Sequence, residues 1–231
     1  MEYDDTITII TGILTPMFVE KIIESYKDVK HKMISSWNSS IHSYKILIHA
    51  LKSNGFKIVL SDYPKYRCSA NYQIVCVKNG IKMAMELGYK YICRSRTDIF
   101  PLNHIKFLEV TRDLYIEKLT VLSGISLPNK IFFVDLIMCG SCEQISAMWS
   151  KLEGPEILYK NVELHILENY AKCEINTQED VKKYLSFSKD RCIESNIEFI
   201  WYRPNGINFF PTTSHYVKLI SEYCNAPFAY D

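Results

Sequence analysis

The sequence predicts an α/β protein with a mostly parallel central sheet flanked by helices. In the first hundred residues, short β-branched or apolar runs alternate with longer segments whose apolar residues recur at helical spacing. This alternation is typical of a parallel sheet with helices on its faces. Of the 231 residues, 48% are hydrophobic and 23% are charged, as in ordinary globular proteins. No segment has the composition of a linker, so we expect a single domain, 1–231, with two lobes, 1–100 and 101–231.

The expected elements follow one another as strand and helix, with clear boundary signals. Thr15-Pro16 begins the first helix, because Thr is a good N-cap and Pro suits the first helical position. Gly55 and Gly88 are expected to end the next two helices. The predicted strands are 6–11, 32–37, 56–61, 89–94, 120–123, 131–138 and 199–202. The other predicted helices are 43–54, 72–87, 143–152 and 155–171, with a last one from Tyr216.

Charge and composition argue against several broad classes. The net charge of +1 is not that of a nucleic-acid-binding domain, which usually carries a clear basic excess. No apolar run is long enough to form a transmembrane segment, and the acidic start 1–5 lacks the basic region of a signal peptide. We therefore expect a cytoplasmic protein. The absence of GxGxxG, P-loop and GxSxG motifs argues against dehydrogenases, P-loop kinases and α/β-hydrolases.

The eight cysteines lie mostly in apolar segments, where free Cys behaves as a small hydrophobe. Cys139 and Cys142 form a lone CxxC motif, and no second CxxC or His cluster completes a zinc site. We expect structural thiols here, with metal or redox use as the alternative. Among the histidines, only His215 lies late in the chain in a polar, loop-like run where it could reach a metal or phosphate.

The strongest functional signal is the segment Arg94–Asp98, which is expected at the end of a buried strand. In open α/β sheets, ligands bind beyond the carboxyl ends of the strands. Two guanidinium groups and a carboxylate suit a phosphate-bearing ligand with a divalent metal. Arg94 and Arg96 alternate along the strand, so they share one face and need anionic partners, either Asp98 or a bound phosphate. The alternative roles for Asp98 are a helix N-cap or an ion pair with Arg96.

Other polar residues near predicted strand ends could contact the same ligand. Asp62 follows the third strand and could accept from a ribose or uracil, or cap the turn before Pro64. Asn71 and Gln73 begin the next helix, and Asn71 is either its N-cap or an amide that contacts a base or sugar hydroxyl. Asp135 lies in an apolar run, where a bare charge is costly. It is either a general base with a raised pKa or an acceptor of backbone N–H groups.

An ordered set of short motifs resembles the WavE-type lipopolysaccharide and capsule glycosyltransferases, a family of the GT-A fold. Arg94–Asp98 resembles the family's Lys/Arg-x-Arg-Ser/Thr-Asp segment, a variant of the Asp-x-Asp metal motif. Asn71–Gln73 resembles its Asn-x-Gln helix, and Val134-Asp135 resembles its Ser-Asp pair. The remaining similar segments, within the span from Ile7 to Tyr159, are 8–12, 34–37, Gly80 with Ile81 and Ala84, Gly140, Trp149 and 155–159.

The resemblance implies a GT-A-like domain in which a Rossmann-like half binds a nucleotide-sugar and the other half binds the acceptor. It implies inverting transfer from a UDP- or GDP-linked donor to a hydroxyl of a glycan acceptor, in a bacterial or viral-host cytosol. Asp98 would bind Mn²⁺ or Mg²⁺, and Asp135 would be the catalytic base. The expected donor contacts are Thr11, Gly12, Asp62, Asn71, Gln73, Arg94 and Arg96.

The sequence departs from the family pattern at several of these positions. Arg96 stands where the family has the first Asp of Asp-x-Asp, so metal binding would depend on Asp98 alone. Thr11 replaces the usual Gln, and Ile13 replaces the usual Pro. Two alternatives therefore stay open. One is a non-catalytic nucleotide- or sugar-binding module of the same fold. The other is a nucleotidyltransferase, which needs two metal-binding carboxylates near Asp98.

Overall fold

The computed structural model describes residues 4–39, 41–65, 69–127, 130–150, 162–203 and 206–210. Within these ranges, the main sheet has seven strands in the order β3-β2-β1-β4-β7-β6-β8, and a smaller sheet has the order β10-β9-β5. The strands of the main sheet are β1 (Thr6–Thr11), β2 (Lys32–Trp37), β3 (Lys57–Ser61), β4 (Tyr91–Arg96), β6 (Thr120–Leu127), β7 (Lys130–Ser141) and β8 (Ser186–Phe187). Those of the smaller sheet are β5 (Ile99–Pro101), β9 (Phe199–Arg203) and β10 (Gly206–Phe210).

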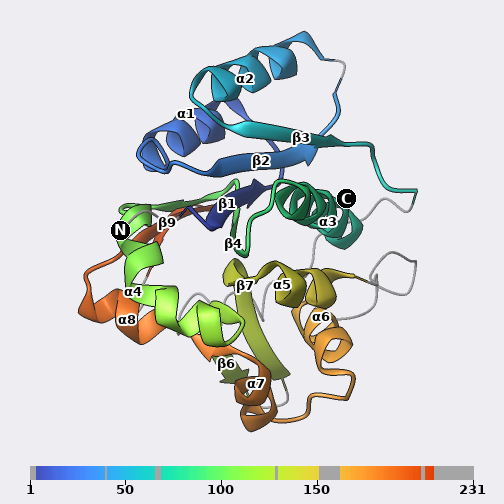
Figure 1. Cartoon of the computed structure of the whole chain (residues 1–231), viewed down its shortest axis with the longest axis vertical. Helices are drawn as coiled ribbons and strands as arrows, with labels where there is room; N and C mark the ends of the chain where they lie inside the picture. The colour runs from blue at the N-terminus through green and yellow to red at the C-terminus, as the bar shows by residue number, and fades with distance from the viewer. Residues whose placement is uncertain are drawn as a thin grey trace.

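Helices cover both faces of the main sheet (Figure 1). The helices α1 (Pro16–Ser25) and α2 (His42–Ser53) lie on one side of β2 and β3, and α3 (Ser69–Glu86) lies on the other. The connections from β1 to β2 and from β3 to β4 run in opposite directions across the sheet, and right-handed crossovers then put their helices on opposite faces. The other helices are α4 (His104–Glu117), α5 (Cys142–Trp149), α6 (Val162–Ala171), α7 (Gln178–Tyr184) and α8 (Lys189–Glu194).

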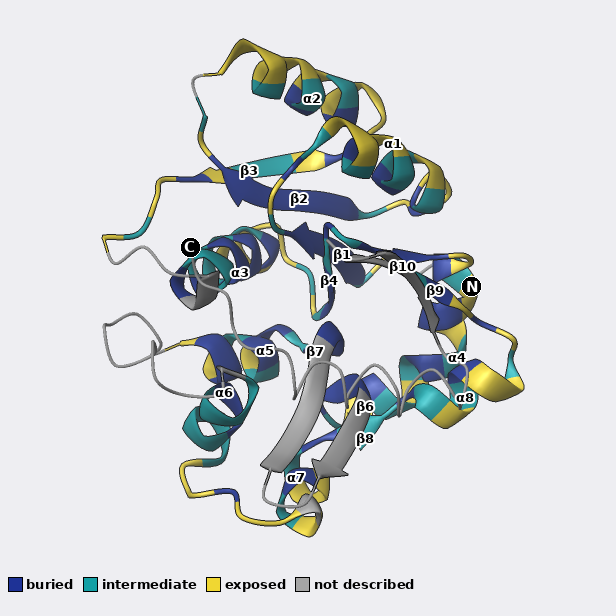
Figure 2. Cartoon of the chain, turned by 180° about the vertical axis from the view of Figure 1, so that it is seen from behind, coloured by how far each residue is buried: buried dark blue, intermediate teal, exposed yellow. Residues whose placement is uncertain are grey.

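The parallel half of the sheet is built around β1, which pairs with β2 on one side and β4 on the other. Side chains alternate along a strand, so β1 serves two cores. Ile7 and Ile9 pack in the core beneath α3 and α5, whereas Ile10 packs with α1 and α2. All of β1 and β2 is buried, and β3 at the edge is partly exposed (Figure 2). Burial on both faces explains why these strands read as continuous apolar runs rather than alternating ones.

The second half of the sheet changes strand direction. β7 runs antiparallel to β4, β6 runs antiparallel to β7, and the short β8 is parallel to β6. The predicted fold class, an α/β domain with a mostly parallel central sheet flanked by helices, is confirmed. One sheet passes through both expected lobes, and their division at residue 100 stays a prediction. No helix in the described ranges combines the length and apolar character that crossing a bilayer requires.

Several predicted boundaries and elements need correction. The strand predicted at 89–94 spans Tyr91–Arg96, because a turn at Gly88 (φ 82°) continues through Tyr89 and Lys90. The helix predicted from Tyr72 begins at Ser69. The helix α4 was not predicted, although Asn103 caps it by accepting from the Lys106 backbone N–H at 3.0 Å. The short elements β5, β8, β10, α7 and α8 were also missed. The predicted helix from Tyr216 and the start of the one at 155–171 lie outside the described residues.

Candidate functional site

The strand order creates a topological switch point between β1 and β4. From β1 the chain passes through α1 to β2 on one side, and it returns through α3 to β4 on the other side. In open α/β sheets, ligands bind outside the carboxyl ends of the strands at such a point. Gly12 follows β1 there, and Thr97 and Asp98 follow β4. The switch point therefore coincides with the segment that the sequence singled out.

Gly12 and Thr97 hold the two strand ends in close contact. Gly12 has φ 137°, and a Cβ built on it would lie 2.5 Å from Thr97 Oγ1. The Thr97 N–H donates to the Thr11 carbonyl at 3.0 Å, and the Ser36 hydroxyl donates to the Gly12 carbonyl at 2.6 Å. Only glycine fits both this backbone conformation and this space. The backbone of β1 can therefore approach a ligand without an intervening side chain.

Arg94 lies beneath this edge as a buried cation, 1% exposed. Its Nε donates to the Thr11 hydroxyl at 3.2 Å, and that hydroxyl donates in turn to the Ser95 carbonyl at 3.1 Å. The guanidinium carbon lies 5.2 Å from the centroid of the Trp149 ring, within cation–π range. Arg94 thus places positive charge on the α5 side of β4.

Arg96 and Asp98 form a bidentate ion pair at the edge itself. Arg96 Nε donates to Asp98 Oδ1 at 2.9 Å, and Arg96 Nη2 donates to Asp98 Oδ2 at 2.7 Å. The side chains are 27% and 18% exposed. This geometry corresponds to the ion pair that the sequence left open as an alternative to metal binding. Within the described ranges, no three His, Cys, Asp or Glu side chains gather as a metal-binding cluster.

Asp62 lies at the same sheet edge but far from Asp98. It follows β3, is exposed, and accepts a long hydrogen bond from Asn38 Nδ2 at 3.4 Å. Three strand spacings separate β3 from β4, which amounts to about 14 Å. Asp62 and Asp98 therefore do not share one metal ion. They are suited to opposite ends of an extended ligand.

An aromatic cluster at the ends of β2 and β3 was not predicted from the sequence. Trp37 and Tyr63 are stacked, with ring centroids 5.4 Å apart and planes within 9°. Tyr72 of α3 meets both rings edge-on, with centroids 5.2 and 6.0 Å away. Trp37 is buried, whereas Tyr63 is 51% exposed. The available signal was that Trp37 ends one predicted strand and Tyr63 follows another closely.

The amides at the start of α3 divide between interior and surface. Asn71 is buried, at 1% exposure, and Gln73 is half-buried. Asn71 is not an N-cap, because α3 already begins at Ser69 and Asn71 lies within its first turn. The helix thus starts two residues before the amide that was expected to cap it. Asn71 is therefore left as an interior amide next to the aromatic Tyr72.

Asp135 lies in β7, two residues before the end of the ladder between β7 and β4. Ser95 pairs with Ile137, and β7 runs antiparallel to β4. The ladder between the two strands ends at this pair, and the pairing of β7 with β6 shifts between Met138 and Val134. The side chain of Asp135 lies outside the described residues, and so does His215. The role of Asp135 therefore stays a prediction.

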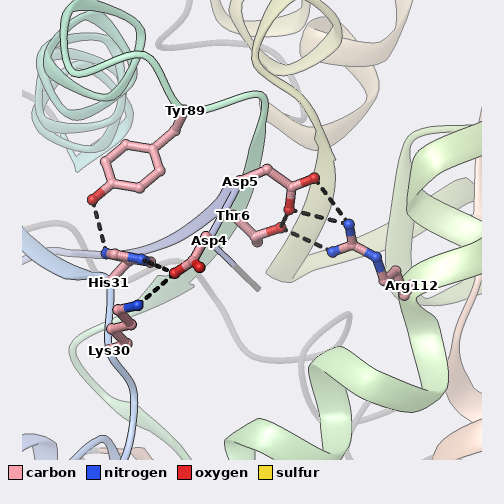
Figure 3. Close-up of polar contacts among 7 residues, drawn as sticks. All are labelled: Asp4, Asp5, Thr6, Lys30, His31, Tyr89 and Arg112. Atoms are coloured by element: carbon pink, nitrogen blue, oxygen red, sulfur yellow. Dashed lines mark hydrogen bonds and ion pairs between the residues drawn. The ribbon is translucent and has the colours of Figure 1, made fainter. Parts of the chain in front are cut away.

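The opposite, amino edge of the sheet carries a dense polar network (Figure 3). Arg112 of α4 donates to both carboxylate oxygens of Asp5 at 3.1 and 2.9 Å. His31 Nε2 lies 3.0 Å from Asp4 Oδ1, and its Nδ1 lies 3.0 Å from the Tyr89 hydroxyl. Burial raises the pKa of Asp5, but hydrogen bonds from Arg112 and Thr6 outweigh it and hold the pKa below its usual value. These contacts link β1 to α4 and to β2.

Known proteins give little further information on this chain. No protein-family model matches the sequence, and no curated protein matches it either. Matching solved structures include a cytidylyltransferase of Leptospira borgpetersenii, with TM-score 0.46, 13% identity, and coverage of 98% of this chain and 99% of that one.

A glycosyltransferase involved in glycosylation of the major capsid of PBCV-1 matches with TM-score 0.41 and 10% identity, over 80% of this chain and 82% of that one. A 4-diphosphocytidyl-2C-methyl-D-erythritol synthase of Anaerococcus prevotii matches with TM-score 0.46 and 13% identity, over 78% of this chain and 96% of that one. At these values the likeness carries no argument about activity. The conclusion that this is an α/β domain with a mostly parallel sheet rests on the strand order itself.

Proposed function

We propose that this chain is a glycosyltransferase that transfers a sugar from a nucleoside diphosphate-sugar to a hydroxyl of a glycan acceptor. The observation that supports this best is the convergence at the switch point. Gly12 follows β1 and the Arg96–Asp98 pair lies at the end of the neighbouring β4, so both are at one sheet edge. A diphosphate there would have a close backbone approach, a forked cation and a carboxylate within one small region.

Arg96 is the side chain best suited to the diphosphate. Its planar fork already binds two oxygens of a carboxylate in the bidentate geometry that also fits phosphate. A diphosphate would replace Asp98 as the hydrogen-bond partner of the Arg96 guanidinium, and the Asp98 carboxylate would become available for another ligand. Arg94 is held beneath the edge by Thr11 and Trp149. Its positive charge is therefore already in place when a ligand binds, and no rearrangement of the side chain is needed.

Asp98 would then hold a divalent cation that arrives with the donor. Mg²⁺ is usually bound by one or two carboxylates, with substrate phosphates and water completing the shell. One carboxylate with both oxygens at the edge fits that donor set. A bound Mn²⁺ or Mg²⁺ would supply Lewis-acid stabilisation of the departing diphosphate, worth several kcal/mol.

The aromatic cluster suits the nucleoside end of the same ligand. Tyr63 is held flat against Trp37, and about half of its surface is exposed. Stacking of a base on an aromatic ring contributes about 1–3 kcal/mol and tolerates any base. Asp62, next to Tyr63, would accept from a ribose hydroxyl. The distance of about 14 Å across the strands separates this end from the Arg96–Asp98 pair.

Asp135 is the proposed general base, and its substitution provides the test of glycosyl transfer. Asp135→Asn keeps the side-chain shape and removes the basicity. We expect donor affinity to stay within a few-fold, while transfer falls by roughly 10²–10⁴. Transfer is measured with a panel of UDP- and GDP-sugars and hydroxyl acceptors in Mn²⁺. The matched control is Asp113→Asn on α4, an exposed carboxylate paired with Arg191, which should leave transfer unchanged.

The same panel separates the rival functions. Thermal shift with each donor, with and without Mn²⁺, reports binding, since saturation at 100 times Kd stabilises by about 2.7 kcal/mol. Binding without transfer or hydrolysis of any donor would favour a non-catalytic module. Release of pyrophosphate from a nucleoside triphosphate and a sugar 1-phosphate would favour a nucleotidyltransferase. Either result contradicts the proposed glycosyl transfer.

A further inference from the structure

Two cysteines on neighbouring strands, β4 and β7, lie opposite each other in the centre of the main sheet. Cys93 of β4 and Cys139 of β7 are register partners in an antiparallel pair. Both are free thiols and are 0% and 1% exposed. The CxxC spacing suggested Cys142 as the neighbour of Cys139, but Cys142 begins α5 and donates its thiol to the Tyr89 carbonyl at 3.0 Å. The motif visible in the sequence is therefore not the thiol pair of the structure.

The hydrogen bonds of the ladder determine which type of cross-strand pair the two cysteines form. The Cys142 N–H donates to the Lys90 carbonyl at 2.9 Å, so the neighbouring pair Tyr91 and Ser141 is a non-hydrogen-bonded one. Pairs alternate along an antiparallel ladder, and Cys93 and Cys139 are two pairs further on. They too form a non-hydrogen-bonded pair, for which Cα atoms lie about 4.5 Å apart. Disulfides span Cα separations of about 4.4–6.8 Å.

The surroundings of the pair make its two thiols unequal. Burial raises the pKa of Cys93, but hydrogen bonds from Cys139 and His104 outweigh it and bring the pKa below that of an ordinary thiol. Burial and the neighbouring Cys93 raise the pKa of Cys139 well above its usual value. His104 is itself buried, with Nε2 2.7 Å from the Thr8 hydroxyl. Cys93 is thus the more acidic thiol of the pair.

We propose that Cys93 and Cys139 form a redox-active dithiol that closes to a cross-strand disulfide on reaction with a peroxide. This inference is independent of the proposed glycosyl transfer. It depends on the register partnership of the two cysteines and on the non-hydrogen-bonded phase of the ladder between their strands. The bond would tie β4, which ends in Arg96, to the strand that carries Asp135.

The reaction proceeds in two steps that balance. The Cys93 thiol gives up its proton and its sulfur attacks one oxygen of hydrogen peroxide. The O–O bond breaks, and the leaving hydroxide takes up a proton, so that a sulfenic acid and a first water are produced. Cys139 then loses its proton and attacks Sγ of Cys93, so that the S–S bond forms, the S–O bond breaks and a second water leaves. The two thiols lose two protons and two electrons in total, and the peroxide is reduced to two waters.

Peptide mapping of the full-length chain tests the proposal. The reduced protein is treated with hydrogen peroxide, unfolded in iodoacetamide and digested with trypsin. We expect residues 91–94 to be linked to residues 131–151, with a mass two hydrogens below the sum of the free peptides. Cys173, an exposed thiol, reports whether oxidant was sufficient. If Cys173 is oxidised while Cys93 and Cys139 are both alkylated, the proposal is wrong.

Variants identify the partner of Cys93, because the peptide 131–151 contains both Cys139 and Cys142. The link should persist in Cys142→Ser and fall by about tenfold or more in Cys139→Ala. The opposite result would assign the bond to Cys142 and overturn the proposal. The wild-type map and Cys142→Ser stay informative even if the buried Cys139→Ala variant fails to fold.

Discussion

Each edge of the main sheet carries an Arg–Asp ion pair, and the two pairs differ. At the amino edge, Nη2 of Arg112 on α4 donates to both carboxylate oxygens of Asp5, 107 residues away in sequence (Figure 3). At the carboxyl edge, Arg96 uses Nε and Nη2 to bind the two oxygens of Asp98, two residues away. The side chains are similarly exposed, at 27% and 30% for the first pair and 27% and 18% for the second. The pairs therefore differ in sequence separation and in how many guanidinium nitrogens hold the carboxylate.

The difference in sequence separation indicates that the Asp5–Arg112 pair is a structural contact, whereas Arg96 can exchange Asp98 for another partner. Asp5 and Arg112 come together only in the folded chain, so their attraction is gained on folding and stabilises it. Arg96 and Asp98 are near each other in the unfolded chain as well, so their pair contributes less to the difference between the two states. A ligand can therefore replace Asp98 at the Arg96 fork with little loss of fold stability.

The largest expected effect is at Gly12, where the carboxyl edge does depend on tight packing. Gly12→Ala should lower the free energy of unfolding by about 2–4 kcal/mol, since it combines a strained backbone at φ 137° with a Cβ 2.5 Å from Thr97 Oγ1. Gly88→Ala is the matched control, because φ is 82° but no atom lies within 4 Å of the new Cβ. It should cost only about 1 kcal/mol. Urea unfolding measures the free energy of unfolding of both variants. An equal decrease in the two would show that the contact with Thr97 is unimportant.

A smaller effect distinguishes the two ion pairs directly. Asp5→Asn should lower the free energy of unfolding by about 1–2 kcal/mol, because Arg112 Nη2 loses a charged acceptor brought in from a distant part of the chain. Asp98→Asn should change it by less than about 0.5 kcal/mol. Thermal or urea unfolding of the ligand-free variants at neutral pH gives both values. A large loss in Asp98→Asn would assign Asp98 a structural role and weaken the proposed site.

The smallest effect is a pH dependence at the amino edge. The folded pKa of Asp5 is lowered, so its stabilising contribution is fully present above the unfolded pKa of about 3.9 and is lost as pH falls through the folded pKa. The stability difference between wild type and Asp5→Asn should be constant above about pH 5 and shrink below about pH 4. Urea midpoints from pH 3 to pH 7 measure it. If the stability difference between wild type and Asp5→Asn grew as the pH fell, the lowered pKa of Asp5 would be contradicted.

The sequence predicted the parallel half of the fold well for a physical reason. Strands buried on both faces give continuous apolar runs, and Thr15-Pro16 and Gly55 mark helix boundaries by local rules. The later half was predicted poorly because β8 and α8, with two and six residues, are too short to show a periodic pattern, and β8 is defined by its pairing with β6. The helix α4 was missed although its cap at Asn103 is a local signal.

The candidate site could be predicted only where it follows from strand ends. Arg94–Asp98 and Asp62 were found because charge after an apolar strand is visible in sequence. The stacking of Trp37 on Tyr63 was not, because it joins the ends of two neighbouring strands whose order is a tertiary fact. The Cys93–Cys139 pairing was hidden for the same reason, and the nearby CxxC motif pointed to another cysteine.

A donor site at the carboxyl edge of the sheet is tested most directly by comparing Arg96 and Arg112 in one titration. Binding of UDP- and GDP-sugars in Mn²⁺ is measured by calorimetry for wild type, Arg96→Lys and Arg112→Lys. Lysine keeps the charge but loses the fork, so Arg96→Lys should weaken donor binding by about tenfold or more. Arg112→Lys should leave the donor Kd within about twofold while lowering fold stability. Equal weakening by both variants, or weakening by Arg112→Lys alone, would contradict a donor site at the carboxyl edge of the sheet.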